Sequence, residues 1–267
     1  MRTLTFLCLL ALLAPLTHAA ETLDARAIME QVDARDDGNN AVMDMEMVLI
    51  DKQGNQRSRT IKSFRRDAGE DGRDTQSIMF FLSPADVKDT GFLTMDYHDV
   101  TVDDDQWLYL PALKKTKRIA SSDKSSSFMG TDFTYADMTK RNLDYYDYTL
   151  LKEEVIDGHN VWVIQSVPNN AKEREETGYS KAVVYVRQDN FMVIRAVNWV
   201  EKGGKLKYME VKTLEQIDGI WVGTEMVMTT RKGRTIEHQT VMHSRNVQFN
   251  QPMTDDQFSL RALEQGL

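Results

Sequence analysis

The chain has 267 residues and a formal net charge of −8, with 33 Lys and Arg against 41 Asp and Glu. Net negative charge argues against nucleic acid or an anionic membrane surface as the main partner. The length fits one large β domain or two small ones, and a core of that size needs no disulfide bonds to support it.

The N-terminus has the three parts of a secretory signal peptide. Arg2 supplies a positive charge, residues 4–16 form an almost unbroken apolar run, and small residues follow at Ala19 and Ala20. The apolar run is shorter than a stable membrane anchor requires. We therefore expect cleavage after Ala19 and export to the periplasm.

Removal of the expected signal peptide, residues 1–19, leaves a mature domain of residues 20–267. The leader holds one basic residue and no acidic one, so the formal charge becomes −8 − 1 = −9. The leader also holds Cys8, the one cysteine of the chain. The mature domain is therefore expected to have no disulfide bond and no cysteine that acts as a nucleophile or metal ligand.

One helix is predicted at the start of the mature domain, from about Asp24 to Asp36. Asp24 suits the N-cap position. Leu23, Ala27, Ile28 and Val32 form an apolar stripe with helical spacing. The stripe indicates a helix that packs on the rest of the domain through one side.

Most of the remaining chain alternates with a period of two, which predicts β-strands. The strands predicted in the first half are residues 43–49, 57–66, 77–82, 92–97, 106–110 and 114–119. Those predicted in the second half are residues 145–155, 161–167, 181–187, 191–200, 205–215, 221–230 and 234–247. Turns such as Asp157-Gly158 and Asp218-Gly219 join them as hairpins. An antiparallel sheet of roughly a dozen strands must curl or close to protect its edges, and without a Pro/Gly/Ser-rich linker we expect one domain.

Residues 120–142 interrupt the strand pattern. Ser121–Ser127 is polar, whereas Phe128–Met138 is rich in aromatic residues and methionine and does not alternate. A loop of this length inside a compact domain is usually functional. We expect its aromatic part to cover a cavity as a gate, with Gly130 as the hinge, and its serine part to be disordered.

Residue patterns that support catalysis or metal binding are scarce in the sequence. The motifs HExxH, GxSxG and GxxxxGK[ST] are absent. His238 and His243 are five residues apart on one predicted strand, so their side chains should point to opposite faces. The acidic stretch of residues 96–105 lacks the spacing and the glycine of an EF-hand loop, and is more typical of a solvated hairpin tip. We therefore predict no enzymatic activity, no metal site and no cofactor.

Methionine is abundant, and 14 of the 15 methionines remain once Met1 is removed with the leader. Its flexible side chain adapts to ligands of different shapes, so a methionine-lined surface suits apolar binding, although any single methionine is more often ordinary core. The side chains predicted to contact lipid, in the cavity or in the lid, are Met43, Met45, Met47, Trp107, Tyr109, Phe128, Met129, Phe133, Tyr135 and Met138.

A short basic run forms the last predicted strand of the first half. It consists of Lys114, Lys115, Lys117 and Arg118. Such a run either meets phosphate headgroups or a partner protein, or is simply an exposed strand face. The sequence alone leaves both alternatives open.

Three segments resemble periplasmic outer-membrane lipoprotein-sorting proteins of the LolA-like superfamily. They are Trp107–Ile119, Ser127–Met138 and the C-terminal Asp255–Leu263. The two central segments together are specific, and the resemblance extends over essentially the whole mature chain.

The resemblance implies a mostly β fold: an incomplete, half-open antiparallel β-barrel around an apolar cavity, with an N-terminal helix and short lid helices. It also implies a periplasmic carrier of lipid or of lipoprotein acyl chains that serves outer-membrane biogenesis. An inner-membrane exporter of the RND/MMPL type is the partner that it points to. The classical carrier of this superfamily holds its lid closed with an arginine inside the cavity, which the three matching segments do not place.

The alternative function is a lipid-sensing or accessory subunit of an envelope complex that performs no net transport. Domains that resemble this one occur in envelope-stress regulators, where they usually accompany a second domain. We expect the present chain to have no length to spare for such a domain. A related alternative is an accessory protein with an ordinary filled core.

Overall fold

The computed structural model describes residues 24–267, and the expected signal peptide lies outside the described residues. Its strands are β1 (Asn40–Asp51), β2 (Gln56–Ala68), β3 (Asp74–Ser83), β4 (Gly91–Asp96), β5 (Asp105–Leu110), β6 (Lys115–Arg118), β7 (Tyr146–Ile156), β8 (His159–Pro168), β9 (Tyr179–Arg187), β10 (Val193–Val200), β11 (Lys205–Ile217), β12 (Ile220–Lys232) and β13 (Thr235–Phe249). Its helices are α1 (Ala25–Asp33), α2 (Ala171–Thr177) and α3 (Leu260–Gln265), with the short 3₁₀ turns η1 (Pro111–Leu113), η2 (Ser121–Asp123), η3 (Phe128–Gly130), η4 (Ala136–Met138), η5 (Leu143–Tyr145) and η6 (Asp255–Phe258).

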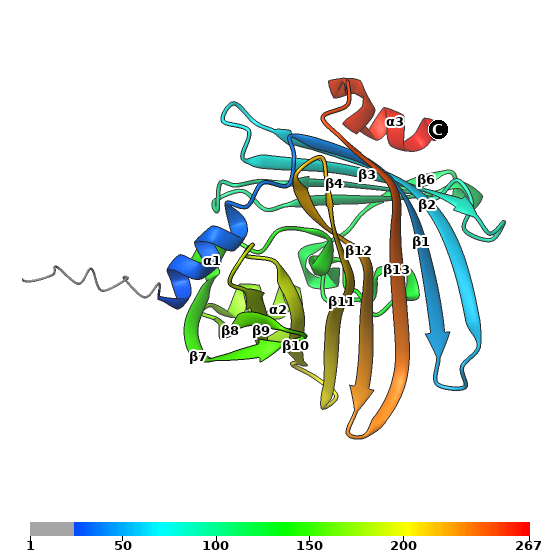
Figure 1. Cartoon of the computed structure of the whole chain (residues 1–267). Helices are drawn as coiled ribbons and strands as arrows, with labels where there is room; N and C mark the ends of the chain where they lie inside the picture. The colour runs from blue at the N-terminus through cyan, green and yellow to red at the C-terminus, as the bar shows by residue number, and fades with distance from the viewer. Residues whose placement is uncertain (1–23) are drawn as a thin grey trace, which may run out of the picture.

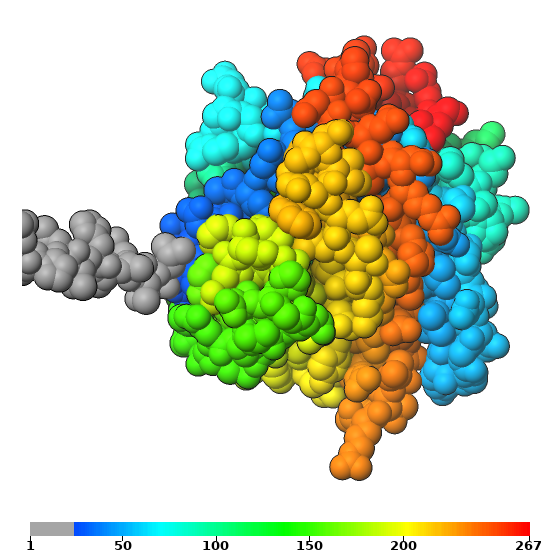
Figure 2. Space-filling view, in the orientation of Figure 1, coloured from blue at the N-terminus to red at the C-terminus, as the bar shows by residue number. Residues whose placement is uncertain are grey.

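The thirteen strands form one antiparallel sheet in the order β6-β5-β4-β3-β2-β1-β13-β12-β11-β10-β9-β8-β7. Each half of the chain is a meander, and the two halves meet where β1 pairs with β13. The sheet curls round on itself without joining its two edges, β6 and β7 (Figure 1). On the face seen in Figure 2, β11, β12 and β13 form a continuous wall, and the tip of the β12–β13 hairpin projects from it. The predicted half-open antiparallel barrel is confirmed.

One connection links the two edges of the sheet. It runs from Ile119, directly after β6, to Tyr145, directly before β7, and we call residues 119–145 the strap. A segment that joins opposite edges of a curled sheet must cross its open side. The strap does so with the short turns η2 to η5, which lie within the curl in Figure 1. The topology therefore places the predicted gate over the inner face of the sheet.

The N-terminal half of the sheet is apolar on both faces. In β3, Phe81 points to the inner face and packs with Met47 and Phe92, whereas its neighbour Phe80 points to the outer face. The outer face is covered by α3, whose Leu263 is fully buried. A Cβ atom at Gly91 would lie 2.6 Å from the Leu263 side chain, so a glycine in β4 is what lets α3 lie this close.

Helix α1 covers the inner face of the C-terminal half. The Asp24 side chain accepts a hydrogen bond from the Ala27 backbone N–H at 2.7 Å, which caps the helix as predicted. Ile28 is fully buried against Ile164, Val184 and other apolar side chains of β8 to β10. Among residues 24–267, no helix has both the length and the apolar character needed to cross a membrane.

Candidate functional site

The aromatic part of the strap packs directly on the inner face of the sheet. Phe128 is fully buried, with its ring centroid 4.9 Å from that of Phe92 and 6.3 Å from that of Phe81. Tyr135 meets Phe128 edge-on at 5.6 Å. Aromatic pairs at these separations add stability beyond the area that they bury. The strap therefore supplies part of the core of this half of the molecule.

Methionines surround this aromatic cluster. Met47 is buried, and it is flanked by partly buried methionines from the sheet and the strap: Met45, Met79, Met129, Met138 and Met242. The structure thus brings most of the predicted lipid-contacting side chains into one cluster. Phe133 is buried in the strap as well, whereas Met43 packs against a separate cluster that contains Ala41 and Phe249.

Trp107 and Tyr109 lie on the opposite face of the sheet. Both pack with Phe258 and with α3, while Leu108 between them packs with the inner cluster. Alternate residues of a strand point to opposite faces, so the same step that brings Leu108 inward takes its two neighbours outward. Trp107 and Tyr109 do not line the inner face, which corrects their predicted place in the cavity or lid.

A buried carboxylate fastens the middle of the strap to the sheet. Asp132 is 3% exposed, and its carboxylate accepts hydrogen bonds from the Oγ1 hydroxyls of Thr230 at 2.5 Å and Thr240 at 2.7 Å. Its second oxygen also lies 2.6 Å from Nδ1 of His238, and its backbone N–H donates to Thr240 at 3.0 Å. Because a buried carboxylate is costly unless every oxygen has partners, this set fixes the strap in one position. We call it the Asp132 latch.

A second polar contact holds the strap near Gly130. Nη1 of Arg59, on β2, donates a hydrogen bond of 2.6 Å to the Met129 carbonyl oxygen, and the guanidinium lies 6.0 Å from the Phe81 ring centroid. Burial lowers the pKa of Arg59. At the contact, Met129 and Gly130 adopt positive φ values of 50° and 78°, which only glycine adopts without strain. The backbone is thus unusual at the predicted hinge, whose movement stays a prediction.

The serine part of the strap is ordered, so the predicted disorder is wrong. Lys124 is 5% exposed, and its ammonium lies 3.1 Å from a carboxylate oxygen of Glu176 on α2. The Lys124 backbone N–H bonds to Ser121, and its carbonyl accepts from Ala136. A buried, paired charge and these backbone bonds compensate for the low apolar content of the segment.

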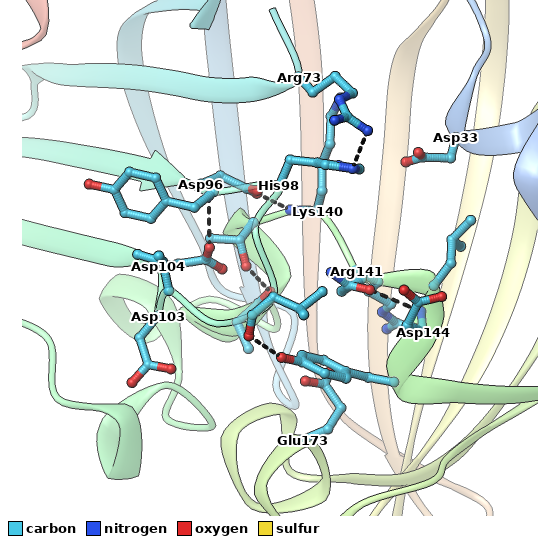
Figure 3. Close-up of a pocket in the computed structure, with 18 of the residues that line it drawn as sticks. Asp33, Arg73, Asp96, His98, Asp103, Asp104, Lys140, Arg141, Asp144 and Glu173 are labelled. Atoms are coloured by element: carbon cyan, nitrogen blue, oxygen red, sulfur yellow. Dashed lines mark hydrogen bonds between the residues drawn. The ribbon is translucent and has the colours of Figure 1, made fainter. Parts of the chain in front are cut away.

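A polar pocket of about 500 Å³ opens where the end of the strap meets α1, α2 and the β4–β5 loop. Figure 3 shows Asp96 and Asp104 beside each other in this pocket, with Arg141 on another side. Burial and the nearby Asp104 raise the pKa of Asp96 to about 7. The Asp96 carboxylate accepts a 2.5 Å hydrogen bond from the Lys140 backbone N–H, so it also anchors the strap. Among residues 24–267, no group of three or more His, Asp or Glu side chains is arranged to hold a metal ion.

Comparisons with known proteins place the chain in a family. The profile of a family described as "Uncharacterized protein" matches residues 73–265. A DUF1329 family protein from Desulfovibrio piger is 31% identical, and its crystal structure superposes with a TM-score of 0.82 over 90% of this chain and 97% of that one. The chain belongs to the DUF1329 family. No curated protein matches the sequence significantly.

Two further crystal structures link the DUF1329 fold to LolA. A putative outer membrane lipoprotein-sorting protein domain from Vibrio parahaemolyticus is 28% identical, with a TM-score of 0.80 over 90% of this chain and 98% of that one. A LolA superfamily protein from Nitrosomonas europaea is 18% identical, with a TM-score of 0.68 over 90% of this chain and all of that one. The second likeness concerns the fold alone. The LolA-like fold expected from the sequence motifs is confirmed.

The basic run lies at one edge of this DUF1329 sheet. Lys115, Lys117 and Arg118 belong to the edge strand β6, and Lys114 precedes it in the left-handed conformation with φ of 47°. Lys117 faces Asp123 at 3.5 Å, and Nε of Arg118 bonds to Asp105 at 2.6 Å. Lys114 and Lys115 are exposed. Their contact with a headgroup or a partner stays a prediction.

Sequence reasoning missed the residues that hold the strap, above all Arg59 and Asp132. Arg59 lies in a polar strand next to other arginines and is 70 positions from Met129. Asp132 is 98 to 108 positions from its three partners. The one local signal for Asp132 was the presence of a charged residue in a segment rich in aromatic side chains.

Proposed function

We propose that this DUF1329 protein is a periplasmic carrier of lipid or of lipoprotein acyl chains between the inner and outer membranes, and that it is not an enzyme. In support, the fold is LolA-like, and the relative from Vibrio parahaemolyticus is described as a lipoprotein-sorting protein. Export through a cleaved leader of residues 1–19 belongs to the proposal. So does a single functional domain over residues 20–267.

The observation that carries the proposal is the nature of the cover on the inner face. An apolar, methionine-rich surface is covered by one segment that the Asp132 latch and the Arg59 contact hold in place. If the strap lifts, Met45, Met47 and Phe92 lose their cover. Water is a poor replacement for the strap there, whereas an acyl chain is a good one, because each buried methylene gains about 0.8 kcal/mol.

The same arithmetic explains why a carrier needs a cover that opens. A single acyl chain binds a membrane with an association constant of only about 10⁴ M⁻¹. A carrier must match that affinity roughly, because a much tighter site would not deliver its cargo and a much weaker one would not take it up. A strap that competes with the cargo for one apolar face lowers the apparent affinity of the site into this range.

The proposed partner is an inner-membrane exporter of the RND/MMPL type that hands lipid to the carrier. The exposed basic edge at β6, with Lys114 and Lys115 at its start, is the proposed contact for headgroups or for this partner. Opposite charge on the partner would steer the encounter and make its rate depend on salt. No cofactor is part of the mechanism.

The test is what the protein carries when it is purified from the periplasm. Native mass spectrometry and organic extraction should find phospholipid or acylated material in up to stoichiometric amount. Met45→Asp should lower that occupancy, whereas Asp44→Asn, one position away in the same strand, should not. Absence of extractable lipid together with no binding of a fluorescent fatty acid would show that the inner face is an ordinary filled core.

A further inference from the structure

Arg141 occupies an unusual place near the end of the strap. It lines the polar pocket (Figure 3), and its guanidinium carbon lies 5.9 Å from the ring centroid of Tyr146 and 5.8 Å from that of Tyr179. Nη2 donates a hydrogen bond of 3.3 Å to Oδ1 of Asn198, which is 2% exposed on β10. An arginine held between two tyrosines is oriented by packing and keeps its charge.

The hydrogen-bonding capacity of Arg141 is largely unused. A guanidinium has five N–H donors in a planar fork, yet within residues 24–267 Arg141 makes one side-chain hydrogen bond, through Nη2. Its nearest carboxylate oxygen belongs to Asp137 and is 4.0 Å away. The other oxygen of Asp137 already accepts from the Tyr179 hydroxyl and the Thr134 backbone, both at 2.8 Å. Arg141 therefore presents free donors to the pocket.

A second cation lies close by on the inner face. Lys207 is the cross-strand partner of Asn198, and its ammonium is 5.6 Å from the Tyr179 ring centroid. Within the described chain, no carboxylate oxygen lies within 4.0 Å of that ammonium. Burial lowers the pKa of Lys207. The charges of Asp137 and Asp132 act on Lys207, but neither carboxylate forms a close ion pair with it, so the two cations around Tyr179 are left with capacity for a further anion.

Three acidic groups that line the pocket with Arg141 are engaged by other residues. The Tyr146 hydroxyl donates to Glu173, Lys124 pairs with Glu176, and Arg26 pairs with Asp144 at 2.7 Å. Burial raises the pKa of Glu173. Arg141 thus stands beside acidic groups that have other partners, and its own carboxylate contact, with Asp137, is a long one of 4.0 Å.

We propose that Arg141, assisted by Lys207, binds the anionic headgroup, a carboxylate or a phosphate, of the amphiphile that the protein carries. The inference rests on the proposed function and names its cargo class. The headgroup would meet Arg141 in the polar pocket, with Lys207 adding positive charge from the neighbouring inner face. The chain would extend under the strap, since Met138, three positions before Arg141, already packs in the apolar cluster. A planar fork suits two oxygens of one anion, which a neutral headgroup does not offer.

Matched ligands isolate the headgroup from the chain. Oleate and oleyl alcohol share one hydrocarbon chain and differ in charge, and both can be measured by displacement of a neutral environment-sensitive dye from the mature protein. The wild type should bind oleate at least about tenfold more tightly than oleyl alcohol. Arg141→Gln should remove that preference and leave oleyl alcohol unchanged, and Lys207→Gln should reduce it about threefold. Arg73→Gln is the control, because Arg73 lines the same pocket but is exposed and paired with Asp71.

Asn198→Asp tests the same idea without removing a cation. The substitution turns the side-chain amide that Arg141 already contacts into a carboxylate, which forms an ion pair with Arg141. The protein should therefore unfold at a higher temperature, and it should bind oleate about tenfold more weakly because the new carboxylate competes with that of oleate. Thermal unfolding with inorganic phosphate separates a free anion from a lipid headgroup. If phosphate alone stabilises the wild type as much as oleate does, the site serves a free anion and the lipid assignment is overturned.

Equal binding of oleate and oleyl alcohol by the wild type would overturn this inference and leave the carrier function standing. Failure of both amphiphiles to displace the dye would remove the carrier function as well. Unchanged oleate affinity in Asn198→Asp would likewise exclude Arg141 as the anion contact, even if Arg141→Gln proved too unstable to measure.

Discussion

The two faces of the β3–β5 region are both apolar and both covered, yet by covers of different kinds. On the outer face, α3 and η6 bury Phe258 and Leu263, and Arg66 lies 4.7 Å over the Phe258 ring. On the inner face, the strap buries Phe128 against this region and also buries the carboxylate of Asp132 where it reaches β12 and β13. One face is closed mainly by apolar contact, and the other by apolar contact plus a buried polar latch.

The difference indicates which cover is suited to move. Apolar contact is non-directional and tolerates many positions, so it supports a permanent core. The hydrogen bonds of a buried carboxylate form in only one position of the segment that carries it. They are all lost when the segment moves away, as expected of an element with two states. The outer face thus has the features of ordinary core, and the inner face has those that the proposed gate requires. Four substitutions test this contrast, from the largest expected effect to the smallest.

The largest effect is expected from the outer cover. Phe258→Ala removes a buried aromatic ring and should lower the free energy of unfolding by about 3–5 kcal/mol. The rate at which folded protein transfers a fluorescent lipid between vesicles should stay unchanged, because this face takes no part in transfer. Denaturant unfolding and the transfer assay measure the two quantities, and faster transfer in this variant would erase the distinction between the faces.

The inner cover should respond differently to the loss of an aromatic ring. Phe128→Ser should lower the free energy of unfolding by about 1–3 kcal/mol, because the sheet keeps its other contacts when the strap lifts. Lipid transfer should become several-fold faster, since less apolar contact holds the gate shut. Trp162→Ala serves as the core control, with its ring stacked on Phe191 at 5.7 Å. If Phe128→Ser unfolds the protein as badly as this control and leaves transfer unchanged, the strap is core.

The sheet was predictable from local sequence because its signals are local. Alternation locates the strands, and the turns Asp157-Gly158 and Asp218-Gly219 adopt the consecutive positive φ values, 51° and 83° and then 50° and 86°, that such hairpins require. The number of strands and the half-open barrel followed from these patterns and from the resemblance. The strap was located as well, because it is the one long segment that does not alternate.

Local sequence did not predict which face of the sheet is the inner one, nor which residues hold the strap in place. Alternation shows that Trp107 and Leu108 lie on opposite faces, but it cannot identify the inner one when both faces are buried, and here α3 buries the outer face. The latch depends on Asp132 meeting β12 and β13 in space. Such contacts become visible only when the sheet is assembled.

Loss of the latch should have a smaller effect on stability than loss of the Phe258 ring. Asp132→Asn keeps the size of the side chain but leaves one carbonyl oxygen where the carboxylate accepted bonds from Thr230 and Thr240, at a cost of about 1–3 kcal/mol. Hydrogen exchange of strap amides should accelerate, with the amides of β3 unaffected, and lipid transfer should rise. Asp147→Asn, at an exposed aspartate of β7, is the matched control. Equal protection of the strap in both variants would show that the latch does not hold the gate.

The smallest effect concerns the far end of the strap, where Asp96 receives the Lys140 backbone N–H. Burial, with Asp104 nearby, raises the pKa of Asp96 to about 7 from a usual value of 3.8. Between these values the folded state holds a proton that the unfolded state releases, so the contribution of Asp96 to stability falls as the pH rises through this interval. Asp96→Asn does not titrate, so its stability relative to the wild type should rise from pH 4 to pH 7 and then level off, and the rise should be modest because Asp96 is only half-buried. Thermal unfolding at intervals across that range measures the difference.

Asp99→Asn, at an exposed aspartate whose pKa is lowered by the Thr101 hydrogen bonds, should show no such rise. A flat difference for Asp96→Asn would mean that this carboxyl titrates alike in the folded and the unfolded protein, and that its pKa is not raised where it meets the strap.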